Sequence, residues 1–289
     1  MKNKLLTTSA MGLLLASKLS TGAHADSTNF EGPFISLGAE TITTDVDVKE
    51  NASNIPTAAA YTQVASASAV SNFVGFNASA TTIIGRAAKT LTSDDSNEQA
   101  VVEAGNFFAI DDKFLIGLSA RATTGGKAIT KDGTYTLSTI TYGTTSATIA
   151  NTSGTTKHEI TDKASYGIEL SPAYAMNDKA MVYGSLGYSI TTKEAQTIYD
   201  GTTIRKTVED DVDGYTAGVG LRYNIENNFF VDVNARYTKY DDLVVSNSDS
   251  GQSVTTGSAA TITNSTTNTL SNTFESEAYS LGIKVGYKF

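Results

Sequence analysis

The sequence contains no cysteine and no tryptophan, and only three of its 289 residues are proline. A chain without cysteine forms neither disulfide bonds nor thiolate metal sites. Beyond the N-terminal region, no apolar stretch reaches the roughly 20 residues that a membrane-spanning helix needs. These absences exclude a disulfide scaffold, a thiolate metal centre and a bundle of transmembrane helices.

The N-terminus has the features of a secretory signal. Lys2 and Lys4 precede the apolar run 11–16, and the segment 23–25, Ala-His-Ala, fits a small-x-small cleavage site. No cysteine occupies the position that a lipoprotein signal requires. We therefore expect residues 1–25 to be removed and residues 26–289 to form the mature protein.

Basic residues are also scarce. The chain has 21 lysines and arginines against 30 aspartates and glutamates, which gives a formal net charge of −9. Removal of the signal would take away Lys2, Lys4 and Lys18, so the mature charge is about −12 (−9 minus 3). An acidic chain is repelled by phosphate backbones, and nucleic acid is therefore not an expected partner.

Period-two alternation is abundant, and it is clearest at the C-terminus. Every second residue there is apolar or aromatic: Tyr279, Leu281, Ile283, Val285, Tyr287 and Phe289. Polar residues and glycines lie between them, so one strand face meets an apolar phase and the other a polar one. In a soluble sandwich the polar face would meet bulk water, whereas in a membrane barrel it would face the lumen.

The same alternation predicts eight strands in all. They cover residues 33–43, 98–109, 114–123, 166–174, 182–190, 212–225, 229–237 and 279–289. Three connections are tight turns, and the other four are long and polar, covering roughly 44–97, 125–162, 192–211 and 241–273. Alternation of short periplasmic turns with long external loops is typical of outer-membrane barrels. The predicted fold class is therefore an all-β, transmembrane antiparallel up-and-down β-barrel.

A ten-stranded barrel is the alternative. The run Asn72–Leu91 includes Phe73, Val74, Phe76, Ile83 and Ile84, which could supply two further strands. No tight turn lies inside this run, which favours a structured external loop instead.

The chain resembles the OmpA/OmpX-type eight-stranded barrel family of porin-like outer-membrane proteins. The resemblance lies in segments 217–223, 234–237 and 280–289, and segment 32–38 is similar to the family's first strand. It implies insertion in outer-membrane lipid, and passage through periplasmic chaperones and the barrel-assembly machinery. That machinery would read Leu281, Ile283, Val285, Tyr287 and Phe289. The resemblance implies no enzymatic activity and no cofactor, and the stop at Phe289 predicts no periplasmic OmpA domain.

With the apolar face toward lipid, four acids and four bases would point into the lumen. They are Glu40, Glu103, Arg121, Glu169, Arg222, Asp232, Arg236 and Lys284. Charges in a narrow lumen must pair, because an unpaired buried ion costs several kcal/mol. The family resemblance also implies a lumenal salt-bridge network. Such a network either plugs the barrel or gates a narrow water path.

Two further features could carry chemistry. Carboxylates cluster at Glu209, Asp210, Asp211 and Asp213, near Asp241 and Asp242, and would form either a Ca²⁺ or Mg²⁺ site or a solvated rim. No ligand-spacing motif supports a metal site there. His158 is the single histidine of the mature chain, with Ser165 nearby, but the pattern favours a solvated loop histidine over a general base.

The leading functional interpretation is a non-enzymatic outer-membrane protein with a structural or surface-interaction role. A small-solute pore with a gated lumen is the second, and a barrel enzyme acting on lipid or peptide is the third. Single-channel conductance would separate the first two, and a lipid assay of His158→Ala would test the third.

Overall fold

The computed structural model describes residues 27–51, 80–85, 88–142, 147–199, 205–226, 228–250, 254–256, 260–262 and 267–289. The predicted signal, residues 1–25, and the connection 52–79 lie outside these ranges. Apart from one 3₁₀ turn, η1 (Ser27–Asn29), the elements in these ranges are all strands. None of the described residues belongs to a helix that could cross a membrane.

The strands vary widely in length, and the longest are far longer than the alternation alone predicts. They are β1 (Gly32–Glu50), β2 (Ala80–Gly85), β3 (Lys89–Ala109), β4 (Phe114–Thr124), β5 (Ile129–Tyr142), β6 (Ala147–Ala175), β7 (Ala180–Tyr199), β8 (Arg205–Asn224), β9 (Phe229–Tyr240), β10 (Leu243–Ser250), β11 (Val254–Thr256), β12 (Ala260–Ile262) and β13 (Thr267–Lys288).

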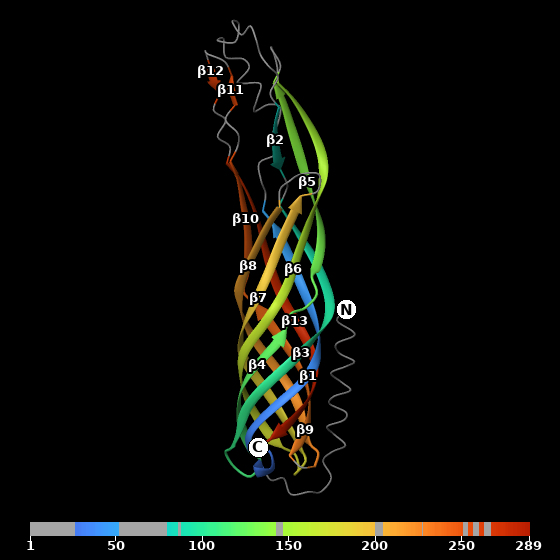
Figure 1. The fold of residues 1–289 in the computed structure, drawn as a ribbon, viewed down its shortest axis with the longest axis vertical. Helices are drawn as coiled ribbons and strands as arrows, with labels where there is room; N and C mark the ends of the chain where they lie inside the picture. Colours follow the sequence, from blue (N-terminus) through green and yellow to red (C-terminus); the bar gives the residue numbers. More distant parts are fainter. Residues whose placement is uncertain are drawn as a thin grey trace.

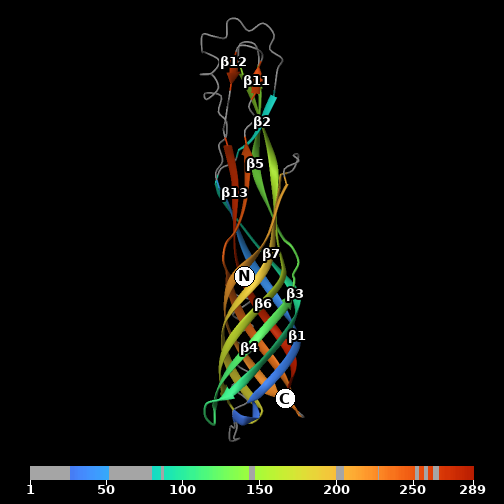
Figure 2. The ribbon, with the colours of Figure 1, turned by 60° about the vertical axis from the view of Figure 1, so that its left-hand side comes forward.

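Antiparallel pairing closes the sheet into a ring. β1 pairs with β3 on one side and with β13 on the other, and the pairs β3–β4, β4–β6, β6–β7, β7–β8, β8–β9 and β9–β13 complete the circuit. Eight to ten strands thus close in a ring, which Figures 1 and 2 show as a long, narrow barrel of tilted strands. The prediction of an all-β antiparallel barrel is confirmed.

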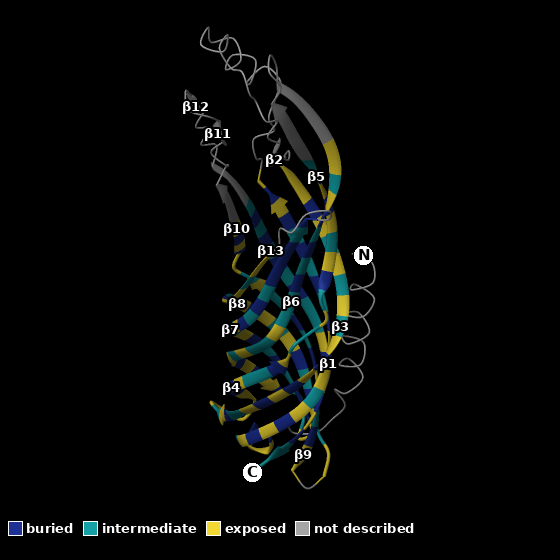
Figure 3. Ribbon diagram, turned by 45° about the horizontal axis from the view of Figure 1, so that its top comes forward, coloured by how far each residue is buried: buried dark blue, intermediate teal, exposed yellow. Residues whose placement is uncertain are grey.

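The outside of the ring is apolar and the inside is largely polar. Large side chains such as Leu37, Leu118, Ile168, Val219 and Ile283 are exposed on the outer face. Their neighbours in sequence are buried, and Figure 3 shows this alternation along the strands. Burial therefore follows the period of two, with the faces reversed relative to a soluble protein.

The strands continue far into the segments predicted as polar loops, so those boundaries are wrong. β1 extends to Glu50, β6 begins at Ala147, and β7 runs to Tyr199. Where β4 and β9 end, β5 takes up pairing with β6 and β10 takes up pairing with β13. The Thr- and Ser-rich composition of these segments concealed the strands, because pairing with long neighbouring strands overrides weak local propensity.

The run Asn72–Leu91, in which two further strands were possible, contributes to β2 and to the start of β3. Residues 80–85 form β2, which pairs with β5 beyond the ring. Leu91 belongs to β3, and residues 72–79 lie outside the described part of the chain.

Two apolar clusters fill the interior of the barrel. One lies at the end with the tight turns and contains Phe30, Phe34, Phe107, Leu115, Ala173, Ala175, Met181, Tyr183 and Phe230. The other lies toward the long extension and contains Val46, Val48, Leu91, Ile129, Ile160, Ala195, Val212, Leu243, Val245 and Phe274. We call them the floor cluster and the roof cluster. The polar part of the lumen lies between them.

Candidate functional site: a buried charge network in the lumen

The structure places the eight predicted charged residues inside the ring, on seven different strands. Each occupies the inward position of the alternation, and all but Arg121 are buried to 6% exposure or less. The Arg121 side chain is 15% exposed. In three ladders an acid and a base lie directly opposite one another: Glu103 opposite Arg121, and Asp232 opposite both Arg222 and Lys284.

Asp232 accepts contacts from four side chains. Its carboxylate lies 3.2 Å from Arg222 Nε and 3.3 Å from Lys284 Nζ. Tyr183 donates its hydroxyl to the same carboxylate at 2.7 Å, and Asn234 Nδ2 donates at 3.2 Å. Arg222 and Asp232 are direct partners in the β8–β9 ladder, as their equal distance from the tight turn predicts. Charge-assisted hydrogen bonds of this kind are the stronger class.

Glu103 and Glu169 extend the network across the lumen. Lys284 donates to Glu103 and so links it to Asp232. Arg236 lies 3.6 Å from Glu103 and 3.1 Å from Glu169. Its guanidinium therefore joins carboxylates from β3 and β6, which flank β4 in the ring and are each three strands away from β9 in the ring order.

A separate pair, Arg121 with Glu40, lies beside a small cavity. Both residues line a cavity of about 40 Å³, together with Glu169, Thr216 and Tyr240. Among the described residues Glu40 Oε1 and Arg121 Nε have no hydrogen-bond partner. A polar cavity of this size has room for at least one water molecule.

Aromatic rings close the lumen beneath Arg222. Its guanidinium carbon lies 4.2 Å from the ring centre of Phe34, 5.0 Å from that of Phe107 and 3.9 Å from that of Phe230. Cation–π attraction adds to the Asp232 contact and fixes the side chain in place. Tyr183 reaches Asp232 because Gly220 leaves room, since a Cβ there would lie 2.2 Å from the Tyr183 ring.

Tyr183 and Asn234 are the network members that sequence reasoning missed. Both lie on inward positions, and each donates to Asp232. Tyr183 breaks the apolar-outward pattern of β7, which is the one signal that could have found it. A buried tyrosine needs a hydrogen-bond partner, and its inward position therefore points to an acceptor in the lumen.

The prediction of a solvated loop for His158 is wrong. His158 lies in β6 with its side chain fully buried, Nε2 at 2.8 Å from Glu50 Oε1 and Nδ1 at 3.0 Å from Thr197 Oγ1. Asn272 donates to the same Thr197 oxygen at 3.0 Å. The residues of this polar group come from β1, β6, β7 and β13. The alternation of Thr156, His158 and Ile160 could have indicated that His158 faces inward. It was missed because the sequence analysis assigned residues 125–162 to a loop.

Replacing His158 with alanine should lower the free energy of unfolding by about 1–3 kcal/mol, because it leaves the buried Glu50 carboxylate without this partner. Urea unfolding of the refolded barrel measures the change. Lys157→Ala is the matched control, because Lys157 is half exposed and its contact with Glu159 is a surface ion pair worth little. Equal stability of the two variants would contradict the structural role.

The carboxylates in the outer half of β8 and directly after β9 form a solvated rim. The backbone N–H of Asp241 donates to the carbonyl of Asp213 at 2.8 Å, which brings the two ends together. Glu209, Asp210, Asp211 and the pair 241–242 are exposed. Within the described ranges, no group of three or more histidine or carboxylate side chains is placed to hold a metal ion.

No protein-family model and no curated protein matches the chain. Solved structures resemble it at low identity. The outer membrane protease OmpT from Escherichia coli is 11% identical over 90% of this chain and 97% of its own, with a TM-score of 0.41. The outer membrane protein OprG from Pseudomonas aeruginosa is 13% identical over 92% and 99%, with a TM-score of 0.34. Ail, the attachment invasion locus protein of Yersinia pestis, is 11% identical over 89% and 99%, with a TM-score of 0.31.

Proposed function

We propose that this chain is a non-enzymatic integral protein of the bacterial outer membrane, an OmpA/OmpX-type barrel in which eight strands span the bilayer. Those strands are β1, β3, β4, β6, β7, β8, β9 and β13, because each pairs with a ring neighbour on both sides. Its role is structural and surface-interacting. The observation that carries the proposal is a filled lumen, in which paired charges lie between two apolar clusters.

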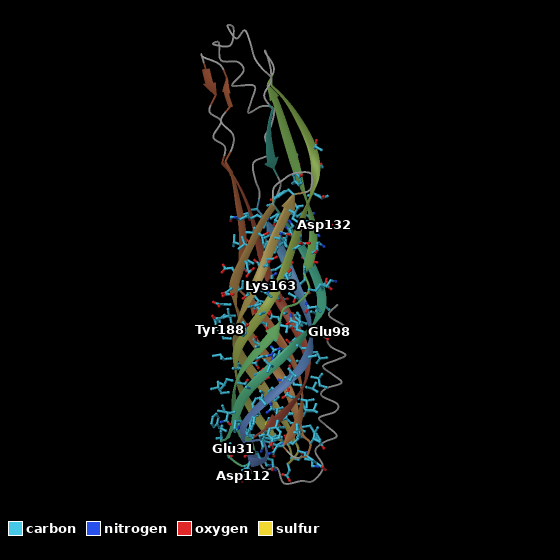
Figure 4. All side chains as sticks on the ribbon, viewed as in Figure 1. Glu31, Glu98, Asp112, Asp132, Lys163 and Tyr188 are labelled. Atoms are coloured by element: carbon cyan, nitrogen blue, oxygen red, sulfur yellow. The ribbon has the colours of Figure 1, made fainter. Side chains whose placement is uncertain are left out.

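The outer surface supports insertion in lipid. Tyr166, Tyr188, Tyr215, Tyr237 and Tyr279 lie on β6, β7, β8, β9 and β13, and apolar residues extend from them toward the tight turns. Aromatic residues at the two edges of an apolar band are typical of transmembrane barrels. In Figure 4, Tyr188 is on the outer surface, with Lys163 and Asp132 further toward the extension and Asp112 at the opposite end. The tight turns would then be periplasmic and the extension external.

The closed lumen opposes a pore. Four acids and four bases neutralise one another, and an eight-stranded barrel is only wide enough for side chains to fill. The second candidate, a gated pore, is favoured by one observation, the small polar cavity beside Glu40 and Arg121.

Conductance across a planar bilayer tests the proposal. The refolded protein should show no steady ion current, and the variant Glu40→Gln should show none either, because the floor and roof clusters both remain. The same preparations should show heat-modifiable mobility on gels, which verifies a closed barrel. Regular single-channel openings of the unaltered protein would overturn the proposal in favour of the pore.

The long external strands offer the surface for interaction. β5 and β6 continue beyond the apolar band as an antiparallel pair, and β10 pairs with the outer half of β13. Main-chain edges and polar side chains on such strands are good contact surfaces. Loss of binding to whole cells when residues 137–152 are replaced by a short turn would support this role, because that replacement leaves Ile129, His158 and Ile160 in place.

The C-terminal strand should act as the assembly signal. Replacing Tyr287 and Phe289 with serine should reduce the amount of folded barrel in the outer membrane several-fold, without reducing export. Phe289 is 70% exposed and, among the aromatic rings of the described residues, contacts that of Tyr287 alone, so folded-state packing offers little reason for an aromatic there. Lys288→Gln is the control at the neighbouring position. Unchanged barrel yield in the double serine variant would show that the assembly machinery does not read these residues.

A further inference from the structure

The chain before β1 lies across one mouth of the barrel. Residues 27–31 belong to no strand, and η1 (Ser27–Asn29) lies at the end of the barrel that carries the tight turns (Figure 1). Glu31 and Asp112 are labelled at this same end in Figure 4. Cleavage after Ala25, as the signal sequence predicts, would make this segment the start of the mature protein.

Phe30 anchors the segment inside the mouth. Its side chain is only 2% exposed and belongs to the floor cluster, with Phe34, Phe107 and Phe230. The cluster gathers side chains from β1, β3, β4, β6, β7 and β9, so the ring of Phe30 shares one buried apolar cluster with six strands of the barrel wall. Three other members of this cluster, Phe34, Phe107 and Phe230, are the rings that surround the Arg222 guanidinium.

Hydrogen bonds at Ser27 and Asn29 attach the segment to two sides of the barrel mouth. Ser27 donates its N–H to the Asp112 carbonyl at 2.9 Å and its hydroxyl to the Asp111 carbonyl, both in the β3–β4 turn. On the other side the Asn29 carbonyl accepts from Asn224 Nδ2 at 2.9 Å and from Lys288 Nζ at 2.8 Å. These partners belong to β8, β13 and the β3–β4 turn, so the segment bridges the opening.

Gly32 turns the chain over the mouth. Its φ of +115° is a conformation that residues with a Cβ rarely adopt. A Cβ there would lie 3.4 Å from the Phe289 carbonyl oxygen, an ordinary contact distance, so the strain of a substitution would come from the backbone angle alone. Strand β1 starts at this residue, so the backbone angle of one glycine separates the barrel wall from the segment that covers its opening.

We propose that residues 27–31 form a cork, a detachable closure that seals the turn-end mouth of the lumen while the barrel wall stays intact. The cork shares no strand ladder with the wall, and one aromatic side chain and a few rim hydrogen bonds hold it. Its release would open the floor cluster, and with it Arg222 and Asp232, to solvent on that side. That side is the periplasm if the membrane orientation proposed above holds, but the closure itself does not depend on it.

The absence of cysteine allows a direct test by thiol labelling. Ala175 is fully buried in the floor cluster, so an Ala175→Cys reporter should react slowly with a charged, membrane-impermeant methanethiosulfonate reagent. Adding Phe30→Ala or Gly32→Ala should raise its labelling rate at least tenfold. Gly32→Ala removes no atom from the mouth and acts only through the backbone. Glu31→Ala, an exposed position in the same segment, should leave the rate unchanged.

A second reporter separates cork release from general loosening. Ala195→Cys lies fully buried in the roof cluster and should label slowly in every background. The proposal is overturned if Ala175→Cys in the otherwise unaltered chain labels as fast as the exposed Lys179→Cys. It is also overturned if Phe30→Ala and Gly32→Ala leave the rate unchanged, or if both reporters accelerate together. This test measures thiol labelling and not conductance. A result against the cork is therefore distinct from a result against the proposal that the lumen carries no ion current.

Discussion

Replacing Asp232 with leucine should lower the free energy of unfolding by about 3–5 kcal/mol, the largest effect expected of any lumenal substitution. The change leaves Arg222 and Lys284 without their shared carboxylate and leaves the Tyr183 hydroxyl without its acceptor. Arg222→Met should cost less, because Lys284, Tyr183 and Asn234 still contact Asp232. Urea unfolding of both variants in the same lipid measures the difference.

The double variant Arg222→Met with Asp232→Leu distinguishes an interacting pair from two independent losses. It should be more stable than the sum of the single effects predicts, by about 1 kcal/mol or more, because no buried charge of this pair then lacks its partner. Glu226→Leu, at an exposed position by the adjacent turn, should change stability by less than about 0.5 kcal/mol. A coupling energy near zero would show that Arg222 and Asp232 contribute independently to the free energy of unfolding. The proposal of a lumen filled by paired charges would then lose its main support.

Introducing arginine at Val219 should cost about 2–4 kcal/mol in a bilayer. Val219 is 64% exposed on the outer face of β8, midway between Tyr215 and Tyr223, which places it near the centre of the apolar band. A guanidinium there must leave water for hydrocarbon or distort the lipid around it. Unfolding of the variant in vesicles gives the cost.

Thr90→Arg is the control for this substitution. Thr90 is exposed on the outward face of β3, opposite Lys49 of β1 in the extension. It should change stability by less than about 0.5 kcal/mol, because its side chain is exposed outside the apolar band. Equal costs at the two positions would mean that the band does not contact lipid, and the membrane-spanning interpretation would be wrong.

Period-two alternation determined which side chains face inward, and it could do so from the sequence alone. A strand turns each successive residue to the opposite face whatever its partners are. The eight charged residues that the alternation assigns to the lumen lie on the inner face of the ring in the structure. The Arg222–Asp232 pair was predicted because a tight turn fixes the register of the two strands that it joins.

Contacts between strands that no tight turn joins could not be read from the sequence. Lys284 meets Glu103 across 181 residues, and His158 meets Glu50 across 108. Their heights in the lumen depend on the register of long connections and on the closure of the ring. Neither is a local property of the chain.

The same distinction explains the strand boundaries and the cork. Polar segments such as 147–165 became strands because long neighbours offered them a ladder, which local propensity does not report. Nothing in the sequence before β1 marks Phe30 as a buried ring, because its environment exists only once six strands of the closed barrel gather at one mouth. Local periodicity thus fixed the two faces of each strand, whereas ring closure decided which inward residues meet.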